Sequence, residues 1–195
     1  MKTFIGTVAV VVSLGWGGAA VADGHAQSWT LDGGNSKIAF GSVKKDTVGE
    51  VHTFDGLSGT VAANGTADIE IDLATVDTLI DIRNERIMEH VFKGAPTASL
   101  TAEFDMDNVA GLSVGETGVI DVEGVLSLVG TNVDVETEMF VARLSETRVL
   151  VTTSDMVMLS TADAGLTTGI DKLMELADLP GITRVAPVTL SLIHI

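Results

Sequence analysis

Strict alternation of apolar and polar residues is the feature of this sequence that most limits its fold. In residues 67–73, ADIEIDL, aliphatic side chains alternate with carboxylates, and residues 133–141, VDVETEMFV, repeat the pattern. Successive side chains of a β-strand point to opposite faces, so a period of two is typical of a strand with one packed face and one face in water. These segments therefore predict antiparallel strands, because parallel strands are buried on both faces.

Weaker strand patterns cover seven further segments, which turn-forming residues separate. The predicted segments are Trp29–Asp32, Lys37–Val43, Val48–Val61, Ala98–Met106, Thr117–Leu128, Arg148–Leu159 and Ala186–Ile195. The expected turns include Gly33-Gly34-Asn35, Asn64-Gly65, Gly111 and Gly130-Thr131-Asn132. Eight or nine strands joined by short turns indicate an all-β sandwich or barrel and disfavour a parallel α/β sheet.

Two segments show a helical period instead. Val76–Phe92 and Asp163–Leu179 place aliphatic residues near i, i+3 and i+4 with charged residues between them, and Pro180-Gly181 follows the second. We predict two short helices inserted between strands, packed against the sheet or over the mouth of a barrel. The sequence shows no internal repeat and no interdomain linker, so a single domain is expected.

The first 22 residues have the features of a cleavable signal peptide. Lys2 precedes the apolar stretch Phe4–Leu14, and Ala20-Val21-Ala22 matches the small-x-small pattern of a signal peptidase site. The stretch is short for a membrane span, so we expect a secreted chain of residues 23–195 without stable membrane insertion. A retained N-terminal anchor is the alternative.

Charge and cysteine content exclude several functions. Eleven Lys and Arg against 27 Asp and Glu give a formal charge of -16, which argues against a nucleic-acid partner because phosphate backbones are anionic. The absence of Cys excludes disulfides, thiolate nucleophiles and Cys-ligated metals. The expected domain contains neither a glycine-rich phosphate loop nor a G-x-S-x-G elbow. We therefore expect a protein that is not an enzyme and has no cofactor.

One His and one Glu are candidates for a site. Glu50, His52 and Phe54 alternate and share one strand face. A Glu-x-His pair supplies two metal ligands, and His90 on the predicted helix is a candidate third. A metal site needs more ligands and supporting hydrogen bonds, so we favour a hydrogen-bonded structural pair and predict no metal. A metal-dependent activity of Glu50 and His52 is the alternative.

The segment Asp81-Ile82-Arg83-Asn84-Glu85-Arg86 is the densest charged stretch. Arg83 and Arg86 have forked donors that suit a polar ligand group. Composition alone favours a different interpretation, in which these arginines pair with Asp77, Asp81 or Glu85 and attach the helix to the rim.

The sequence resembles the YceI-like family of periplasmic lipocalin-like proteins through most of residues 23–195. Several motifs in a characteristic order carry the resemblance, and the likeness is weaker from about Arg148 to Gly181. The motifs are Trp29-x-Leu31-Asp32, Asn35-Ser36-x-Ile38-x-Phe40, Glu50-x-His52-x-Phe54, Gly59, Ile71-Asp72-Leu73, Val76-Asp77-Thr78, the IRNER-containing stretch from Ile80 to Arg86 with Phe92 after it, Thr97–Phe104, and Val122–Val135 around Gly130-Thr131.

This resemblance implies a single antiparallel lipocalin-like β-barrel of about eight strands with two short inserted helices. It also implies an apolar tunnel that holds an isoprenoid lipid, either a polyisoprenoid or an isoprenoid quinone, so the expected protein is a periplasmic carrier. An envelope stress or interaction protein with a filled barrel is the alternative, and the sequence leaves a homodimer open. The inward parity of the strands predicts an apolar lining of Phe40, Phe54, Ile71, Phe92, Phe104 and Met139, with Arg83 or Arg86 at the head group.

Overall fold

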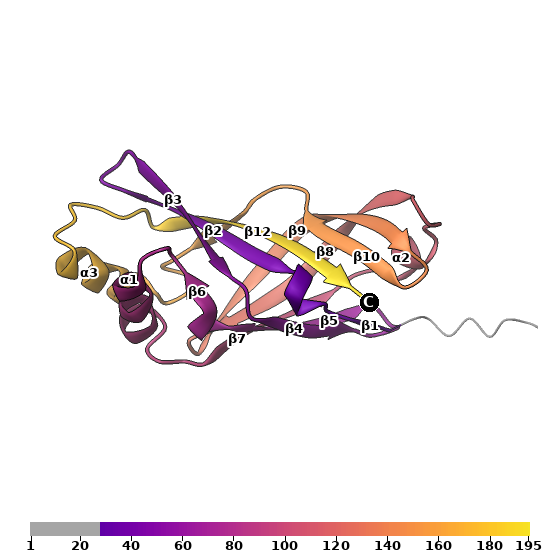
Figure 1. Cartoon of the computed structure of the whole chain (residues 1–195), viewed down its shortest axis with the longest axis horizontal. Helices are drawn as coiled ribbons and strands as arrows, with labels where there is room; N and C mark the ends of the chain where they lie inside the picture. Colours follow the sequence, from indigo (N-terminus) through magenta and orange to yellow (C-terminus); the bar gives the residue numbers. More distant parts are fainter. Residues whose placement is uncertain (1–27) are drawn as a thin grey trace, which may run out of the picture.

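A computed structural model of the protein describes residues 28–195 (Figure 1). The predicted signal peptide, residues 1–22, lies outside these described residues. Among the helices of residues 28–195, none has the length and apolarity needed to cross a bilayer.

One antiparallel sheet contains every strand of the described chain (Figure 1). The strands are β1 (Trp29–Thr30), β2 (Lys37–Lys44), β3 (Val48–Phe54), β4 (Leu57–Val61), β5 (Thr66–Asp72), β6 (Val76–Asp77), β7 (Thr97–Glu103), β8 (Thr117–Leu128), β9 (Thr131–Ser145), β10 (Arg148–Thr153), β11 (Val157–Ser160) and β12 (Val185–His194). The all-β antiparallel prediction is confirmed, with twelve strands in place of about eight.

The larger number arises because two predicted strands, Val48–Val61 and Arg148–Leu159, each divide into two, and because Val76 and Asp77, predicted as helix, form β6. β1 and β2 follow one path along the edge of β12, and β3 with β4 pairs against that path. In the same way, β5 with β6 forms one path, and so does β10 with β11. The twelve strands therefore follow eight paths around the sheet. Hydrogen bonds between Thr30 and Ile195 join β1 to the end of β12, so the sheet closes on itself there.

The alternating segments form strands with the predicted faces. In β5 the aliphatic residues Ile69 and Ile71 are buried, whereas Asp68 and Glu70 between them are exposed. β8 and β9 form the longest hairpin of the described sheet, and its turn is Val129-Gly130. Both turn residues have positive φ, as a type I′ turn requires, which explains the glycine.

The helical segments are shorter than the sequence predicts. The first begins only at Asp81, because Val76 and Asp77 form β6 against β3. It comprises α1 (Asp81–Arg86) and a π-helical turn (Ile87–Val91), and the second is α3 (Thr167–Leu176). The prediction of helix from Val76 was therefore wrong, since pairing with β3 overrides the local helical period. A further short helix, α2 (Asp107–Ala110), was not predicted.

α1 and α3 lie together at one end of the barrel (Figure 1). Gly169 of α3 packs directly on the backbone of the π-helical turn, where a Cβ atom would approach His90 O to 2.5 Å and Val91 Cα to 2.6 Å. Only glycine permits this approach. The two helices therefore form one cover, which determines the shape of this end of the barrel.

Candidate ligand-binding cavity

The interior of the barrel is hollow. A cavity of about 570 Å³ is lined almost entirely by aliphatic and aromatic side chains from the strands, α1 and α3. Inward residues such as Leu100, Val122, Leu126 and Val188 remain only partly buried, although they point into the barrel. A solid core would bury them completely, because protein interiors pack densely. Their residual surface therefore faces the cavity.

The cavity is closed at the end where β1 meets β12. Trp29, Ile120, Val149 and His194 line it there, and each is almost fully buried. Burial lowers the pKa of His194 to about 4, so its imidazole is neutral at neutral pH. Val109 of α2 also lines this end. The closed end thus offers a ligand an apolar environment.

The opposite end of the cavity opens to solvent beneath the β2–β3 hairpin, where residues of α1 and of the segment after α3 also line it. Lys44, Glu50 and Arg83 line the cavity here and remain partly exposed, so water reaches this part of the wall. Arg86 also lines it, and its Nη1 donates to the Leu176 carbonyl of α3 at 3.4 Å. We refer to this end as the mouth.

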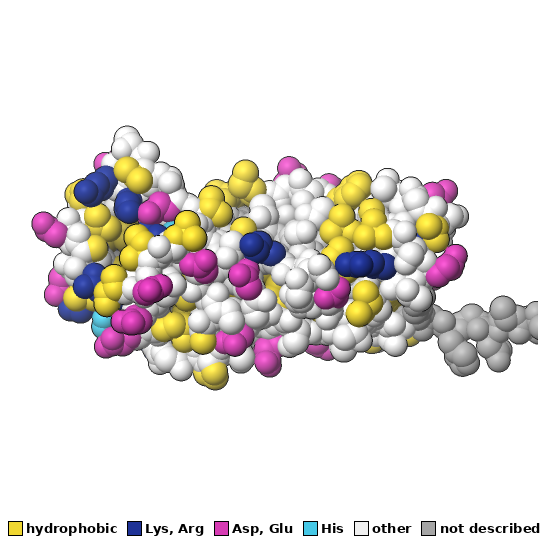
Figure 2. All heavy atoms as spheres, in the orientation of Figure 1, with side chains coloured by type: hydrophobic (Ala, Val, Ile, Leu, Met, Phe, Trp, Pro, Cys, Tyr) yellow, Lys and Arg dark blue, Asp and Glu magenta, His cyan; other side chains and the backbone are white. Residues whose placement is uncertain are grey.

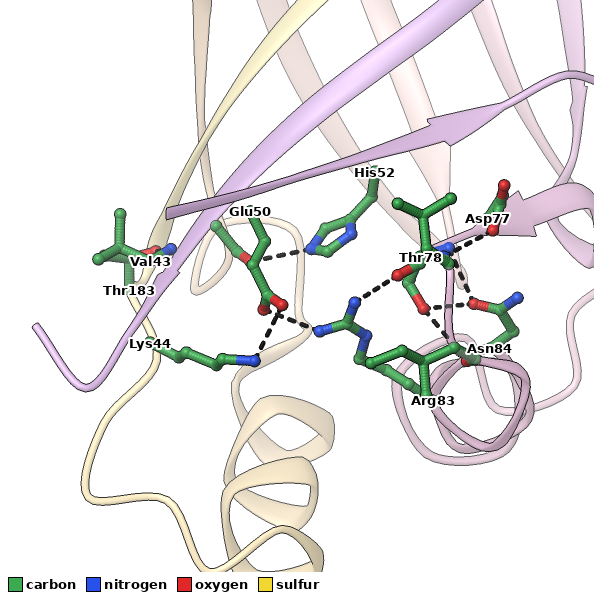
Figure 3. Close-up of polar contacts among 12 residues, drawn as sticks. Val43, Lys44, Glu50, His52, Asp77, Thr78, Arg83, Asn84 and Thr183 are labelled. Carbon is green, nitrogen blue, oxygen red and sulfur yellow. Dashed lines mark hydrogen bonds and ion pairs between the residues drawn. The ribbon is translucent and has the colours of Figure 1, made fainter. Parts of the chain in front are cut away.

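An ion-pair network crosses the mouth (Figure 3). Glu50 Oε1 accepts from Lys44 Nζ at 2.9 Å, and Glu50 Oε2 accepts from Arg83 Nη1 at 2.8 Å. Burial alone would raise the pKa of Glu50, but the hydrogen bonds and charges of Arg83 and Lys44 outweigh it and hold this pKa below its ordinary value. The network joins the hairpin to α1.

The turn before α1 holds Arg83 in position. Arg83 Nη2 donates to the Thr78 carbonyl, and Thr78 in turn donates from its amide and its hydroxyl to Asn84 Oδ1. Thr78 is 1% exposed, so this hydrogen-bonded turn is an ordered part of the barrel rim. The guanidinium therefore has a defined orientation toward Glu50 (Figure 3).

The local pairing that composition favoured for the arginines is wrong. Arg83 pairs with Glu50, 33 residues away, and Arg86 binds a backbone carbonyl, so neither pairs with Asp77, Asp81 or Glu85. The carboxylate of Asp77 instead accepts from the Leu79 amide at 2.7 Å. The β3–β6 pairing causes this difference, because it brings β3 alongside the segment that leads into α1.

His52 lies deeper than Glu50 on the same strand face. Its Nε2 shares a hydrogen bond with Ser42 Oγ at 3.0 Å, and its buried Nδ1 has no partner among the described residues. Burial and the charge of Arg83 lower the pKa of His52, so its imidazole is neutral at neutral pH. The described residues contain no group of three or more His, Asp or Glu able to hold a metal. Glu50 and His52 do not bond to each other as a pair, because both Glu50 oxygens bind cationic side chains and His52 Nε2 bonds Ser42.

The structure places all eight predicted site residues on the cavity wall. These are Phe40, Phe54, Ile71, Phe92, Phe104, Met139, Arg83 and Arg86. The rings of Phe40 and Phe54 stack with centroids 5.4 Å apart, and Phe54 lies 6.0 Å from Phe92. Their contact with a ligand stays a prediction.

Sequence reasoning missed several parts of the wall. It did not include Lys44, which lies directly before a hairpin turn, or Leu173 and Ile170, which point from α3 into the cavity. The helical period of α3 predicted an apolar face packed against the sheet or over the barrel mouth, but it did not identify which of its residues would reach the cavity. Inward parity along β2 would have found Lys44, because it shares a face with Phe40.

A closed antiparallel barrel with an apolar cavity and a charged mouth defines the class of lipocalin-like barrels. A family model described as the YceI-like domain matches residues 29–179, and the chain belongs to this family.

Solved structures agree with this assignment. A polyisoprenoid-binding domain from Saccharophagus degradans, implicated in plant cell wall breakdown, is 39% identical and has a TM-score of 0.83; the match covers 85% of this chain and 97% of that chain. BcnA from Burkholderia cenocepacia is 19% identical with a TM-score of 0.65, covering 84% of this chain and 98% of that chain, and shows the fold alone. A search of curated proteins found no match.

Proposed function

We propose that the protein binds and carries an isoprenoid lipid in its barrel, and that it acts in the periplasm as a binding protein without catalytic activity. The observation that carries this proposal is the apolar cavity of about 570 Å³ that extends from the mouth to His194. Burial of each methylene contributes about 0.8 kcal/mol, so a prenyl chain would bind through its tail. The name of the Saccharophagus relative supports this ligand class.

The hollow interior distinguishes this proposal from a barrel filled by its own side chains. An interaction protein of that kind would have no reason to leave inward residues such as Leu100 and Val122 partly accessible. Empty apolar cavities are destabilising in proportion to their size. A ligand that fills the cavity would remove this cost.

Native mass spectrometry of the protein released from a periplasmic extract without detergent tests the proposal. We expect a chain that begins at residue 23 and carries a noncovalent adduct, which organic extraction identifies as a prenyl quinone or polyprenyl lipid. A protein found only in the cytoplasm would contradict the location. A protein that neither carries nor takes up prenyl compounds would contradict the ligand.

Two unpartnered polar atoms support a quinone as the cargo. Arg83 Nε and His52 Nδ1 are buried without a hydrogen-bond partner among the described residues, and both side chains line the cavity. Buried polar groups are otherwise satisfied in proteins, so they are suited to a ligand oxygen. The head group would lie near the mouth, with the tail directed toward Trp29.

The Arg83→Met variant should discriminate between ligands. We expect its affinity for a short-chain prenyl quinone to fall about tenfold, because a hydrogen bond to a charged group contributes about 1.5–3 kcal/mol. Affinity for the matching prenyl hydrocarbon should change less than twofold. Competition measured by native mass spectrometry compares the affinities for the quinone and the hydrocarbon. The double variant Arg83→Met, Glu50→Gln is the control, because the single variant leaves the Glu50 carboxylate without its Arg83 partner. Equal losses for both ligands would contradict a head-group role.

A further inference from the structure

An exposed leucine in a strained conformation stands beside the mouth. Leu79 is 84% exposed and has a φ of 63°, in the left-handed region that L-residues with a side chain rarely adopt. The Leu79 amide donates a hydrogen bond to Asp77 Oδ1, and the preceding residue, Thr78, is buried. These contacts hold the Leu79 side chain in its exposed position. Backbone strain that surrounding contacts maintain is typical of functional positions.

Leu79 belongs to an apolar patch that continues into the cavity. Ile80 and Ile82 are 45% and 52% exposed, yet both also line the cavity. Val51 of β3 is 69% exposed. It lies two residues before Thr53, whose partner in β6 is Asp77, and Leu79 lies two residues after Asp77, so Val51 and Leu79 are at corresponding positions of the two antiparallel segments. We call Val51, Leu79, Ile80 and Ile82 the mouth patch. Ile80 and Ile82 thus belong both to the exposed patch and to the wall of the ligand cavity.

Basic residues lie beside the mouth patch, together with the exposed carboxylates of Asp81 and Glu85, whereas the outer wall of the barrel carries many carboxylates. Lys44, Lys45 and Arg86 line the mouth. Carboxylates are exposed along the barrel strands, for example Asp68, Glu70, Asp121, Glu123, Asp134, Glu136 and Glu138. Figure 2 shows hydrophobic, basic and acidic side chains intermixed at the end that carries α1 and α3. Apolar residues with cations beside them are suited to the phosphate level of a lipid bilayer.

We propose that the mouth patch docks on the surface of a lipid bilayer, with Leu79 inserted below the head groups and Lys44, Lys45 and Arg86 at the level of the phosphates. The cargo would then pass between bilayer and cavity along Ile80 and Ile82 without crossing water. Transfer of the cargo rests on the proposed function, lipid binding, whereas docking on the bilayer does not. On an anionic bilayer the acidic barrel wall would be repelled, which favours contact through the mouth.

Flotation of the purified protein with phosphatidylcholine vesicles tests the docking surface. We expect the wild type to float with the vesicles and Leu79→Asp to lower the partition coefficient at least tenfold, since one buried leucine contributes about 1.5–3 kcal/mol. Leu144→Asp is the matched control, because Leu144 is 47% exposed on β9 at the closed end. A wild type that does not float, or two variants with equal partition, would overturn the proposal.

A second variant separates docking from folding and from cargo binding. Leu79→Gly removes the apolar side chain and relieves the left-handed strain, so we expect weaker flotation with a Tm at least equal to that of the wild type. Leu79 does not line the cavity, so uptake of a short-chain prenyl quinone in solution should be unchanged. Flotation without quinone uptake by the wild type would refute the cargo and leave docking intact. Unchanged flotation of Leu79→Gly would refute docking.

Discussion

Replacement of Val122 by Trp is expected to lower the affinity for a prenyl ligand at least hundredfold while the barrel stays folded. Val122 points into the cavity from the middle of β8 and is only partly buried, so an indole there occupies the space of the ligand. Displacement of a single isoprene unit, with five carbons, costs about 4 kcal/mol at about 0.8 kcal/mol per carbon. That energy corresponds to about three orders of magnitude in Kd.

The same strand supplies the matched control. Val119 is 56% exposed on the outer face of β8, so Val119→Trp adds the same ring without entering the cavity. Titration of both variants with a short-chain prenyl quinone, followed by native mass spectrometry, measures the difference. Undiminished binding by Val122→Trp would show that the ligand does not occupy the barrel, and thermal unfolding checks that both variants fold.

Acidification is expected to destabilise the protein through His194, by about 3 kcal/mol between pH 7 and pH 4. The pKa of His194 is about 4 in the folded chain, against an ordinary value of 6.5, because the ring is buried. As the pH falls through this window, the unfolded chain takes up a proton that the folded chain does not. Stability therefore declines with falling pH, at about 1.4 kcal/mol per unit of pKa difference.

The His194→Phe variant isolates this contribution. Phenylalanine preserves an aromatic ring in the apolar end of the cavity and cannot be protonated. Urea unfolding at pH 7 and pH 4 should therefore show a loss of stability that is about 3 kcal/mol smaller in the variant than in the wild type. Titrating carboxylates contribute to both proteins and cancel in this comparison. Equal acid sensitivity of the two proteins would mean that His194 is readily protonated in the fold.

The strands and their faces could be predicted because they depend on local sequence. Alternation in residues 67–73 and 133–141 determines which side chains point inward. This parity correctly predicted that Ile71 and Met139 lie on the cavity wall. β8 begins and ends at the predicted residues, Thr117 and Leu128. Periodicity alone was compatible with either a sandwich or a barrel, and the family resemblance predicted the barrel.

The parts that sequence reasoning missed depend on contacts between distant segments. Val76 and Asp77 fit a helical period, but β3 pairs with them and makes them a strand. Arg83 has acidic neighbours in sequence, yet its guanidinium reaches Glu50 because the β3–β6 pairing brings β3 beside α1. Such pairings bring together residues whose sequence separation no local pattern encodes.

By itself, the sequence determined the antiparallel class of the sheet, the inward and outward faces of its strands, and the absence of cysteine chemistry. Only the tertiary structure decided that the barrel is hollow, that one end is closed around His194, and that Leu79 stands exposed beside a charged mouth. The physical reason is that side-chain direction follows from the period of a strand, whereas the space between opposite walls depends on how all strands close together.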